Sequence, residues 1–305
     1  MKKWFWALGW VLTASPLFAS ESQFGYMYTT DLLPKGQTEI EQWLTWRHGR
    51  SQGDMNVLEG RTEFELGVTD NFQAAFYAHY AYLSAFHNNV DDTTAPPEVF
   101  AELQPGPDDH MDNLKFVGAS LEGIYRILSP YTDGLGLALY CEPLGGQGLI
   151  EVESRIILQK NFLDDTLVFV LNATVEQELR DLPGDPDADP GSEEAAQHWD
   201  KETDMNYGLG ISYRFIPEWS LGVEFQNEQE FAGLTPFTDP TNLAFYLGPN
   251  LHYGGKDGFV TVTFLAQLPW SADYANPAPG FVVNGITNAD DFENMRVRIK
   301  AGIYL

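Results

Sequence analysis

Cysteine is almost absent from this sequence, which contains only Cys141. A single cysteine cannot form an internal disulfide, and it cannot supply a cysteine-based zinc site. A disulfide-stapled scaffold and a structural zinc module are therefore excluded. The run Asp185-Pro-Asp-Ala-Asp189 resembles the start of a calcium loop, but Pro190 and Ala196 stand where such a loop has Gly and Glu. A solvated acidic loop is favoured, and we expect neither a metal nor a cofactor.

Positive charge is scarce. The chain has 17 Lys and Arg against 44 Asp and Glu, which gives a formal net charge of −27. Nucleic-acid binding depends on basic side chains that neutralise phosphates. So acidic a chain is a poor nucleic-acid partner, and that function class is excluded.

Long hydrophobic runs are also missing after the first few residues. The start of the chain has Lys2 and Lys3, an apolar stretch from Trp4 to Leu12, and Ala19 at an expected cleavage point. This order is typical of a secretory signal peptide, which we assign to residues 1–19. No later segment is long and apolar enough for a spanning helix. If the exported chain crosses a membrane, it must therefore cross as strands.

Strict alternation of apolar and polar residues is what the sequence has instead. The final segment, 294–305, places Met295, Val297 and Ile299 on one face and basic residues on the other. This period of two indicates a strand between two different environments. An exposed apolar edge strand would invite aggregation. We therefore expect this last strand to pair with the first and to close a barrel.

About twelve such strands follow one another between residues 37 and 305. The connections between strands alternate in length, and the longest ones all fall at the same end of the predicted barrel. Short periplasmic turns and long extracellular loops are typical of outer-membrane barrels. The predicted fold is an all-β, transmembrane, antiparallel up-and-down barrel over residues 37–305, preceded by a periplasmic arm over residues 20–36. A soluble β-sandwich or a lipocalin-like barrel is the alternative.

The signal peptide, the Leu33-Pro-Lys-Gly36 lead-in and the alternating strands resemble Gram-negative outer-membrane β-barrels. Within these, the chain is similar to the porin-like group that includes the meta-pathway phenol-degradation barrels. The usual terminal Phe of such barrels is replaced by Leu305. The resemblance implies an outer-membrane location and a barrel-assembly machinery as folding partner. It carries no catalytic signature and names no substrate. We expect a monomer in contact with outer-membrane lipid and lipopolysaccharide.

Charged residues on the inward face are the candidate site. We expect acidic side chains in the outer half of the lumen, called here the acidic mouth: Glu59, Glu142, Glu151, Glu153, Glu176, Glu178, Asp204, Glu228 and Glu230. The inner half is expected to hold both signs of charge: Glu39, Glu41, Glu63, Glu65, Arg126, Arg214, Arg298 and Lys300. An acidic mouth concentrates cations and repels anions. The pattern predicts a channel for small cationic or neutral solutes.

Two other readings of the lumen remain open. Charges can pair across a narrow barrel and fill it, leaving a closed barrel with a structural, adhesive or sensing role. Glu39 and Glu41 with Arg298 and Lys300 are expected to form such a ladder where the last strand meets the first. The second alternative is a lipid-active enzyme. The six histidines lie in no His-x-Ser pair or Gly-x-Ser-x-Gly elbow, so we expect no catalytic residues.

Overall fold

The structure is a computed structural model that describes residues 22–184, 189, 191–192, 195–236, 239–270, 272–273, 282–283, 286–287 and 292–305. The expected signal peptide lies outside the described residues. Nearly all regular structure is β. In chain order the elements are β1 (Thr38–His48), β2 (Asp54–Thr69), β3 (Phe72–Phe86), the 3₁₀ helix η1 (Glu98–Phe100), β4 (Met111–Leu128), β5 (Gly136–Gly146), β6 (Leu149–Phe162), β7 (Leu167–Leu182), β8 (His198–Ile216), β9 (Trp219–Ala232), β10 (Asn242–Gly254), β11 (Gly258–Gln267), β12 (Ala272–Asp273), β13 (Val282–Val283), β14 (Ile286–Thr287) and β15 (Met295–Tyr304).

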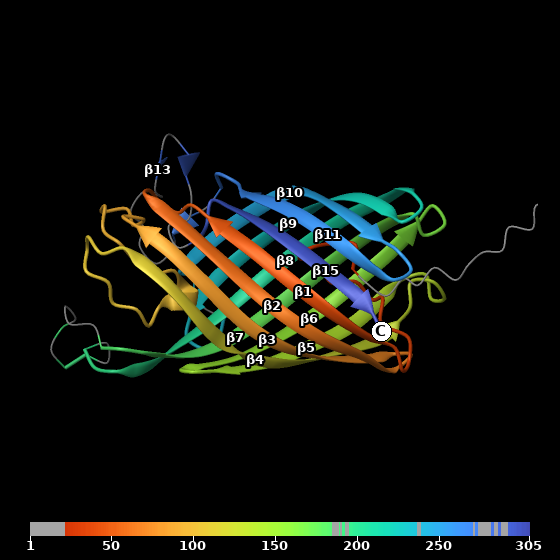
Figure 1. Cartoon of the computed structure of the whole chain (residues 1–305), viewed down its shortest axis with the longest axis horizontal. Helices are drawn as coiled ribbons and strands as arrows, with labels where there is room; N and C mark the ends of the chain where they lie inside the picture. The colour runs from red at the N-terminus through yellow and green to blue at the C-terminus, as the bar shows by residue number, and fades with distance from the viewer. Residues whose placement is uncertain are drawn as a thin grey trace, which may run out of the picture.

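The last strand closes the sheet, as predicted. β15 pairs antiparallel with β1 on one side, from Glu39 opposite Tyr304 to His48 opposite Met295, and with β11 on the other. β1 to β11 and β15 therefore form a closed, twelve-stranded antiparallel barrel (Figure 1). The short β12 extends the sheet beside β10, and β13 pairs only with β14. Closure leaves no free edge in the barrel wall.

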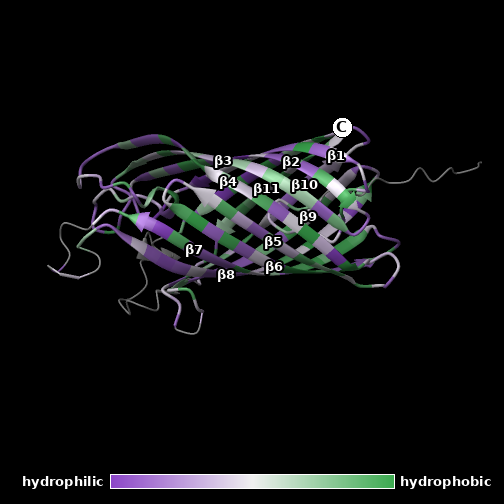
Figure 2. Cartoon of the chain, turned by 90° about the horizontal axis from the view of Figure 1, so that it is seen from below, coloured by the Kyte–Doolittle hydropathy of each residue, from purple (hydrophilic) through white to green (hydrophobic). Residues whose placement is uncertain are grey.

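Side chains alternate between the two faces of the wall. In β1, Glu39 and Glu41 are buried inside, whereas Ile40 and Leu44 are exposed on the outside. Figure 2 shows the same alternation of hydrophilic and hydrophobic residues along neighbouring strands. Cys141 is also exposed on the outer face. Such an apolar outer belt suits lipid and would be costly in water, so the barrel lies in the outer membrane.

The two ends of the barrel differ. The C-terminus and short turns such as 70–71 and 217–218 lie at one end, called here the inner end. The long connection 87–110 and the described parts of the connections 183–197 and 268–294 lie at the other, the outer end (Figure 1). Within the first of these, Phe100 of η1 is fully buried against inward apolar side chains of β2 and β3, including Val57 and Leu83. Among the described residues, no helix is long and apolar enough to cross a membrane.

The arm lies inside the barrel, which corrects its expected position in the periplasm. Of residues 20–36, residues 22–36 are described, and their aromatic and apolar members such as Phe24 and Leu33 are almost completely buried. The backbone N–H of Gly36 donates to the carbonyl of Gly67 (2.7 Å), and the N–H of Gly67 donates to the carbonyl of Gln37 (3.0 Å), which fixes the base of the arm beside β2 at the inner end. The arm enters the lumen because side chains of the wall accept hydrogen bonds from it and because inward glycines of the wall leave space for it.

Candidate functional site: the barrel lumen

Glu224 of β9 is the main attachment point of the arm. Its carboxylate accepts hydrogen bonds from the backbone N–H groups of Gly25 (2.8 Å), Tyr26 (2.8 Å) and Met27 (3.2 Å). Asn250 and Thr263 donate to the same carboxylate, each at 2.9 Å. The side chain is fully buried. A buried carboxylate needs several donors to offset its desolvation, and here the arm supplies three of the five.

Amide side chains of the wall hold the rest of the arm. Asn172 of β7 accepts from the N–H of Tyr28 (2.7 Å) and donates to its carbonyl (2.9 Å). Gln159 of β6 and Gln73 of β3 accept from the N–H groups of Thr30 and Leu33, both at 2.7 Å. These wall residues lie in the halves of their strands nearest the inner end. The arm thus crosses the inner half of the lumen, bound through wall side chains.

Two glycines of β8 make room for the apolar side of the arm. A Cβ atom at Gly208 would lie 2.2 Å from the sulfur of Met27, and one at Gly210 would lie 2.7 Å from the ring of Phe24. Phe24 and Met27 belong to a buried apolar cluster that also contains Phe292. The sequence carried a signal for this contact, because Gly208 and Gly210 leave the inward face of one strand without side chains at two successive positions.

Basic side chains of β15 stack on aromatic rings at this level. The guanidinium carbons of Arg298 and Arg296 lie 3.9 Å and 4.7 Å from the ring centre of Tyr26. Lys300 Nζ lies 4.2 Å from the ring centre of Trp43. Cation–π contacts in desolvated sites stabilise by about 2 kcal/mol. The two contacts with Tyr26 add a second type of attachment between the arm and the closing strand.

The predicted ladder between the first and last strands is only partly present. Lys300 Nζ lies 3.9 Å from the carboxylate of Glu41. Arg298 instead donates to the hydroxyl of Thr45 (2.8 Å) and to the carbonyl of Gly25. The expectation that it lies beside Glu39 and Glu41 is wrong, because the strand register places Glu39 opposite Tyr304 and Arg298 opposite Thr45.

The other inner-half residues divide into two groups. The four carboxylates predicted there are buried, and a fifth, Glu122, lies close to them and accepts from the hydroxyls of Tyr77 (2.6 Å) and Tyr28 (3.2 Å). Sequence reasoning had not selected Glu122. Arg126 and Arg214 bind backbone carbonyls of Asp70 (2.6 Å) and Asp165 (3.2 Å) at the inner-end turns. The buried carboxylates of this group are Glu39, Glu41, Glu63 and Glu65.

All nine residues of the acidic mouth lie on strands of the wall, and most have polar partners. Arginines bind four of them, Glu142 accepts from Ser120 and Tyr140, and Glu230 accepts from Asn242. Within the described chain, the side chains of Glu151, Glu176 and Asp204 form no hydrogen bond or ion pair. The arginine pairs are Glu59 with Arg47, Glu153 with Arg155, Glu178 with Arg180 and Glu228 with Arg296.

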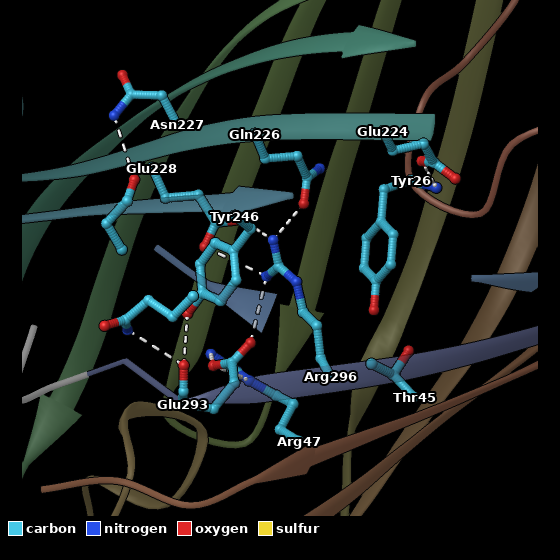
Figure 3. Close-up of polar contacts among 12 residues, drawn as sticks. Tyr26, Thr45, Arg47, Glu224, Gln226, Asn227, Glu228, Tyr246, Glu293 and Arg296 are labelled. Atoms are coloured by element: carbon cyan, nitrogen blue, oxygen red, sulfur yellow. Dashed lines mark hydrogen bonds and ion pairs between the residues drawn. The ribbon is translucent and has the colours of Figure 1, made fainter. Parts of the chain in front are cut away.

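These arginines were missed as site residues, although each occupies an inward position of an alternating strand. The most connected of them are Arg47 of β1 and Arg296 of β15, which are cross-strand partners (Figure 3). Glu293 lies between them, 2.8 Å from Arg47 and 3.3 Å from Arg296. Burial opposes ionisation of Glu293, but the two guanidinium groups outweigh it and hold its pKa below the ordinary value. Tyr246 also donates to the backbone carbonyl of Glu293 (2.9 Å).

Unfilled space lies mainly in the outer half of the lumen. The arm leaves a cavity of only about 30 Å³ at its own level, lined by residues such as Tyr28 and Trp43. A cavity of about 150 Å³ lies nearer the outer end, between β2, β6, β7 and η1. Arg61, Glu151 and Glu176 are among its lining residues. The arm therefore narrows the inner half, and the open space faces the long connections.

Ser120, His79 and Glu142 come together in the lumen but do not have the geometry of a hydrolase. His79 Nε2 lies 2.7 Å from Ser120 Oγ, while Ser120 donates to Glu142 at 2.5 Å. The carboxylate approaches the same ring nitrogen, at 3.7 Å. A nucleophilic relay needs the acid on the opposite nitrogen of the imidazole. This buried trio is a hydrogen-bond network of the wall.

Two solved structures are similar to this chain. An outer-membrane channel from Pseudomonas putida F1 superposes with a TM-score of 0.54 at 10% sequence identity, covering 90% of this chain and 97% of that one. The NanC porin superposes with a TM-score of 0.48 at 10% identity, covering 87% of this chain and 98% of that one. At such identities the likeness concerns the fold. No curated protein matches the sequence. A family model described as a family of unknown function, DUF6662, matches residues 16–305, and the chain therefore belongs to that family.

Proposed function

We propose that the protein is an outer-membrane channel for small solutes of positive or zero net charge, closed at rest by its N-terminal arm. The observation that carries the proposal is the attachment of the arm. Its backbone donors bind side chains of the wall, with Glu224 as the main acceptor. Side-chain contacts of this kind can be exchanged for water without breaking the barrel's own strand pairing. The arm is therefore suited to leave the lumen while the wall stays intact.

A covalent lock on the arm tests this proposal. A Cβ atom at Gly25 would lie 2.7 Å from Cβ of Thr263, so a small shift of the arm brings cysteines at both positions to disulfide distance. Cys141 is first replaced by alanine, since it is exposed and free. In planar bilayers, the oxidised Gly25→Cys/Thr263→Cys protein should conduct at least about tenfold less than the reduced protein, because the disulfide keeps the arm in the lumen.

The single cysteine variants, treated with the same oxidant and reductant, are the matched controls. Equal conductance before and after reduction of a verified disulfide would contradict gating by the arm. No conductance in any state, including variants that release the arm, would reject the channel. The closed barrel with a structural or sensing role through its long connections would then be the better description.

Charge reversal tests the preference for cations. Glu153 and Glu178 neutralise Arg155 and Arg180, so reversing them would disturb the wall. Glu151→Lys and Glu176→Lys change the field of the outer cavity without breaking an ion pair. We expect the pair of substitutions to shift the reversal potential of a salt gradient toward anions. Glu218→Lys, at an exposed inner-end turn, should leave the reversal potential unchanged. An unshifted potential in the Glu151/Glu176 variant would count against an acidic selectivity region.

A further inference from the structure

The outer cavity is lined by one guanidinium group and two carboxyl groups that form no direct contact with a group of opposite charge in the described chain. Across the described residues, no hydrogen bond or ion pair is formed by the side chains of Arg61, Glu151 or Glu176. The guanidinium carbon of Arg61 lies 5.8 Å from the ring centre of Trp43, and its charge is felt by Glu151 without a direct contact. All three line the cavity of about 150 Å³. Partly desolvated charges without partners are costly, and they are typical of a site that a ligand completes.

The other charged side chains of the cavity already take part in ion pairs. Arg47 lies 3.0 Å from Glu59, and Arg180 lies 2.5 Å from Glu178 and 3.1 Å from Glu98. What remains is one guanidinium group and two carboxylates. They come from different strands, β2 for Arg61, β6 for Glu151 and β7 for Glu176. A ligand that satisfies them must carry an anionic group and a cationic group together.

We propose that this cavity binds a small dipolar solute bearing a carboxylate and an ammonium group, as in a short amino acid. The planar guanidinium of Arg61 suits a carboxylate, which it can bind with two parallel hydrogen bonds. Glu151 and Glu176 accept from the three N–H donors of the ammonium group. A cavity of about 150 Å³ accommodates a molecule the size of benzene, which sets the scale of the solute. As the solute class of the channel, this inference rests on the proposed function.

A bare divalent cation fits the cavity less well. Carboxylate oxygens of Glu151, Glu176 and Glu178 do approach within 4.8 Å of one another. Glu178 is bound to Arg180, however, and the positive charge of Arg61 lines the same space. Both features oppose a dication, and Arg61 would still lack a partner. A dipolar solute satisfies all three unpaired groups.

Isothermal titration of the detergent-solubilised full chain tests the site without requiring conduction. The probes are 4-aminobutyrate and β-alanine, with butyrate and butylammonium as analogues that each carry one charge. We expect at least one amino acid to bind and each single-charge analogue to bind at least about tenfold more weakly, the equivalent of 1.4 kcal/mol. Arg61→Gln should weaken amino acid binding about tenfold while strengthening butylammonium binding, because it removes a repulsive charge. A merely misfolded variant would lose both.

Glu151→Gln and Glu176→Gln should weaken the amino acid and butylammonium alike, whereas Lys256→Gln and Glu218→Gln, at exposed turns, should change neither. Absence of amino acid binding, or binding of calcium chloride alone, would overturn the proposal. Binding in detergent by a protein that never conducts would reject the channel and keep this site. Conduction without binding would reject the site and keep the channel.

Discussion

Replacing Glu224 by alanine is expected to release the arm and to raise the time-averaged conductance of the barrel by about 100-fold. The substitution removes the acceptor of three arm N–H groups, those of Gly25, Tyr26 and Met27. Hydrogen bonds to a charged acceptor contribute about 1.5–3 kcal/mol each. New hydrogen bonds to water or to other side chains offset part of this loss. A net loss of about 3 kcal/mol in the free energy of arm binding still changes the ratio of free to bound arm by two powers of ten.

The isosteric variant Glu224→Gln separates the charge from the shape of the acceptor. Its amide oxygen still accepts a hydrogen bond, but its NH₂ group faces N–H donors of the arm, so an increase smaller than that of alanine is expected. Glu218→Gln, at an exposed turn of the same wall, is the control and should conduct like the unmodified protein. Conductance is measured in planar bilayers, and limited proteolysis reports whether the arm has become accessible.

The disulfide lock identifies the origin of any increase. If Glu224→Ala opens the channel by freeing the arm, adding Gly25→Cys and Thr263→Cys and oxidising the pair should close it again. A barrel that stays conductive with the disulfide formed would mean that the substitution had damaged the wall. Unchanged conductance and unchanged proteolysis in Glu224→Ala would contradict the assignment of Glu224 as the main attachment point.

The wall of this barrel could be predicted from sequence because its signal is local. Each strand alternates between lipid and lumen, so faces such as Ile40 and Leu44 against Glu39 and Glu41 are visible within a few residues. Closure by the last strand followed from the same argument, since an amphipathic terminal strand needs a partner. The register between the first and last strands was harder to predict from the sequence. It placed Arg298 opposite Thr45, four residues beyond Glu41, the nearer of the carboxylates with which it was expected to pair.

The position of the arm depends on the interior of the whole barrel. Its sequence shows only that Phe24, Tyr26 and Tyr28 alternate, which fits an additional strand as well as an inserted segment. The decisive features are on the wall, where Gly208 and Gly210 provide space and Glu224 provides an acceptor. These residues lie about 200 positions away in the chain, so no local pattern links them to the arm.

The pairing of lumen charges is similarly nonlocal. Inward carboxylates were recognised, but their neutralisation depends on side chains that reach across or along the wall, as in Arg296 with Glu228, 68 residues apart. Arginines at inward positions of strands can be recognised in the sequence, but they were not predicted as the partners of these carboxylates. The acidic mouth is consequently less uniform than its composition indicated, and Glu151, Glu176 and Asp204 are its members without a hydrogen bond or ion pair to another described residue.

Removal of the carboxylate of Glu293 is expected to destabilise the closing seam of the barrel by about 3–5 kcal/mol, the range measured when one partner of a buried ion pair is deleted. Arg47 and Arg296 face each other across β1 and β15, and the fully buried Glu293 binds both. Glu293→Gln keeps the size of the side chain but leaves two guanidinium groups opposed. Urea unfolding in lipid vesicles, followed by tryptophan fluorescence, measures the free energy of unfolding.

The pH dependence of the same measurement tests the electrostatic origin. Because the pKa of Glu293 is lowered in the folded protein, its ionisation stabilises the fold above the ordinary glutamate pKa. That contribution is lost as the pH falls through the lowered value, so the difference between the unmodified protein and Glu293→Gln should shrink in acid. Glu102→Gln is the matched control, since Glu102 pairs with Lys115 at 2.8 Å in an exposed setting and should cost less than about 1 kcal/mol. A Glu293→Gln protein no less stable than this control at neutral pH would show that the seam is held by strand pairing alone.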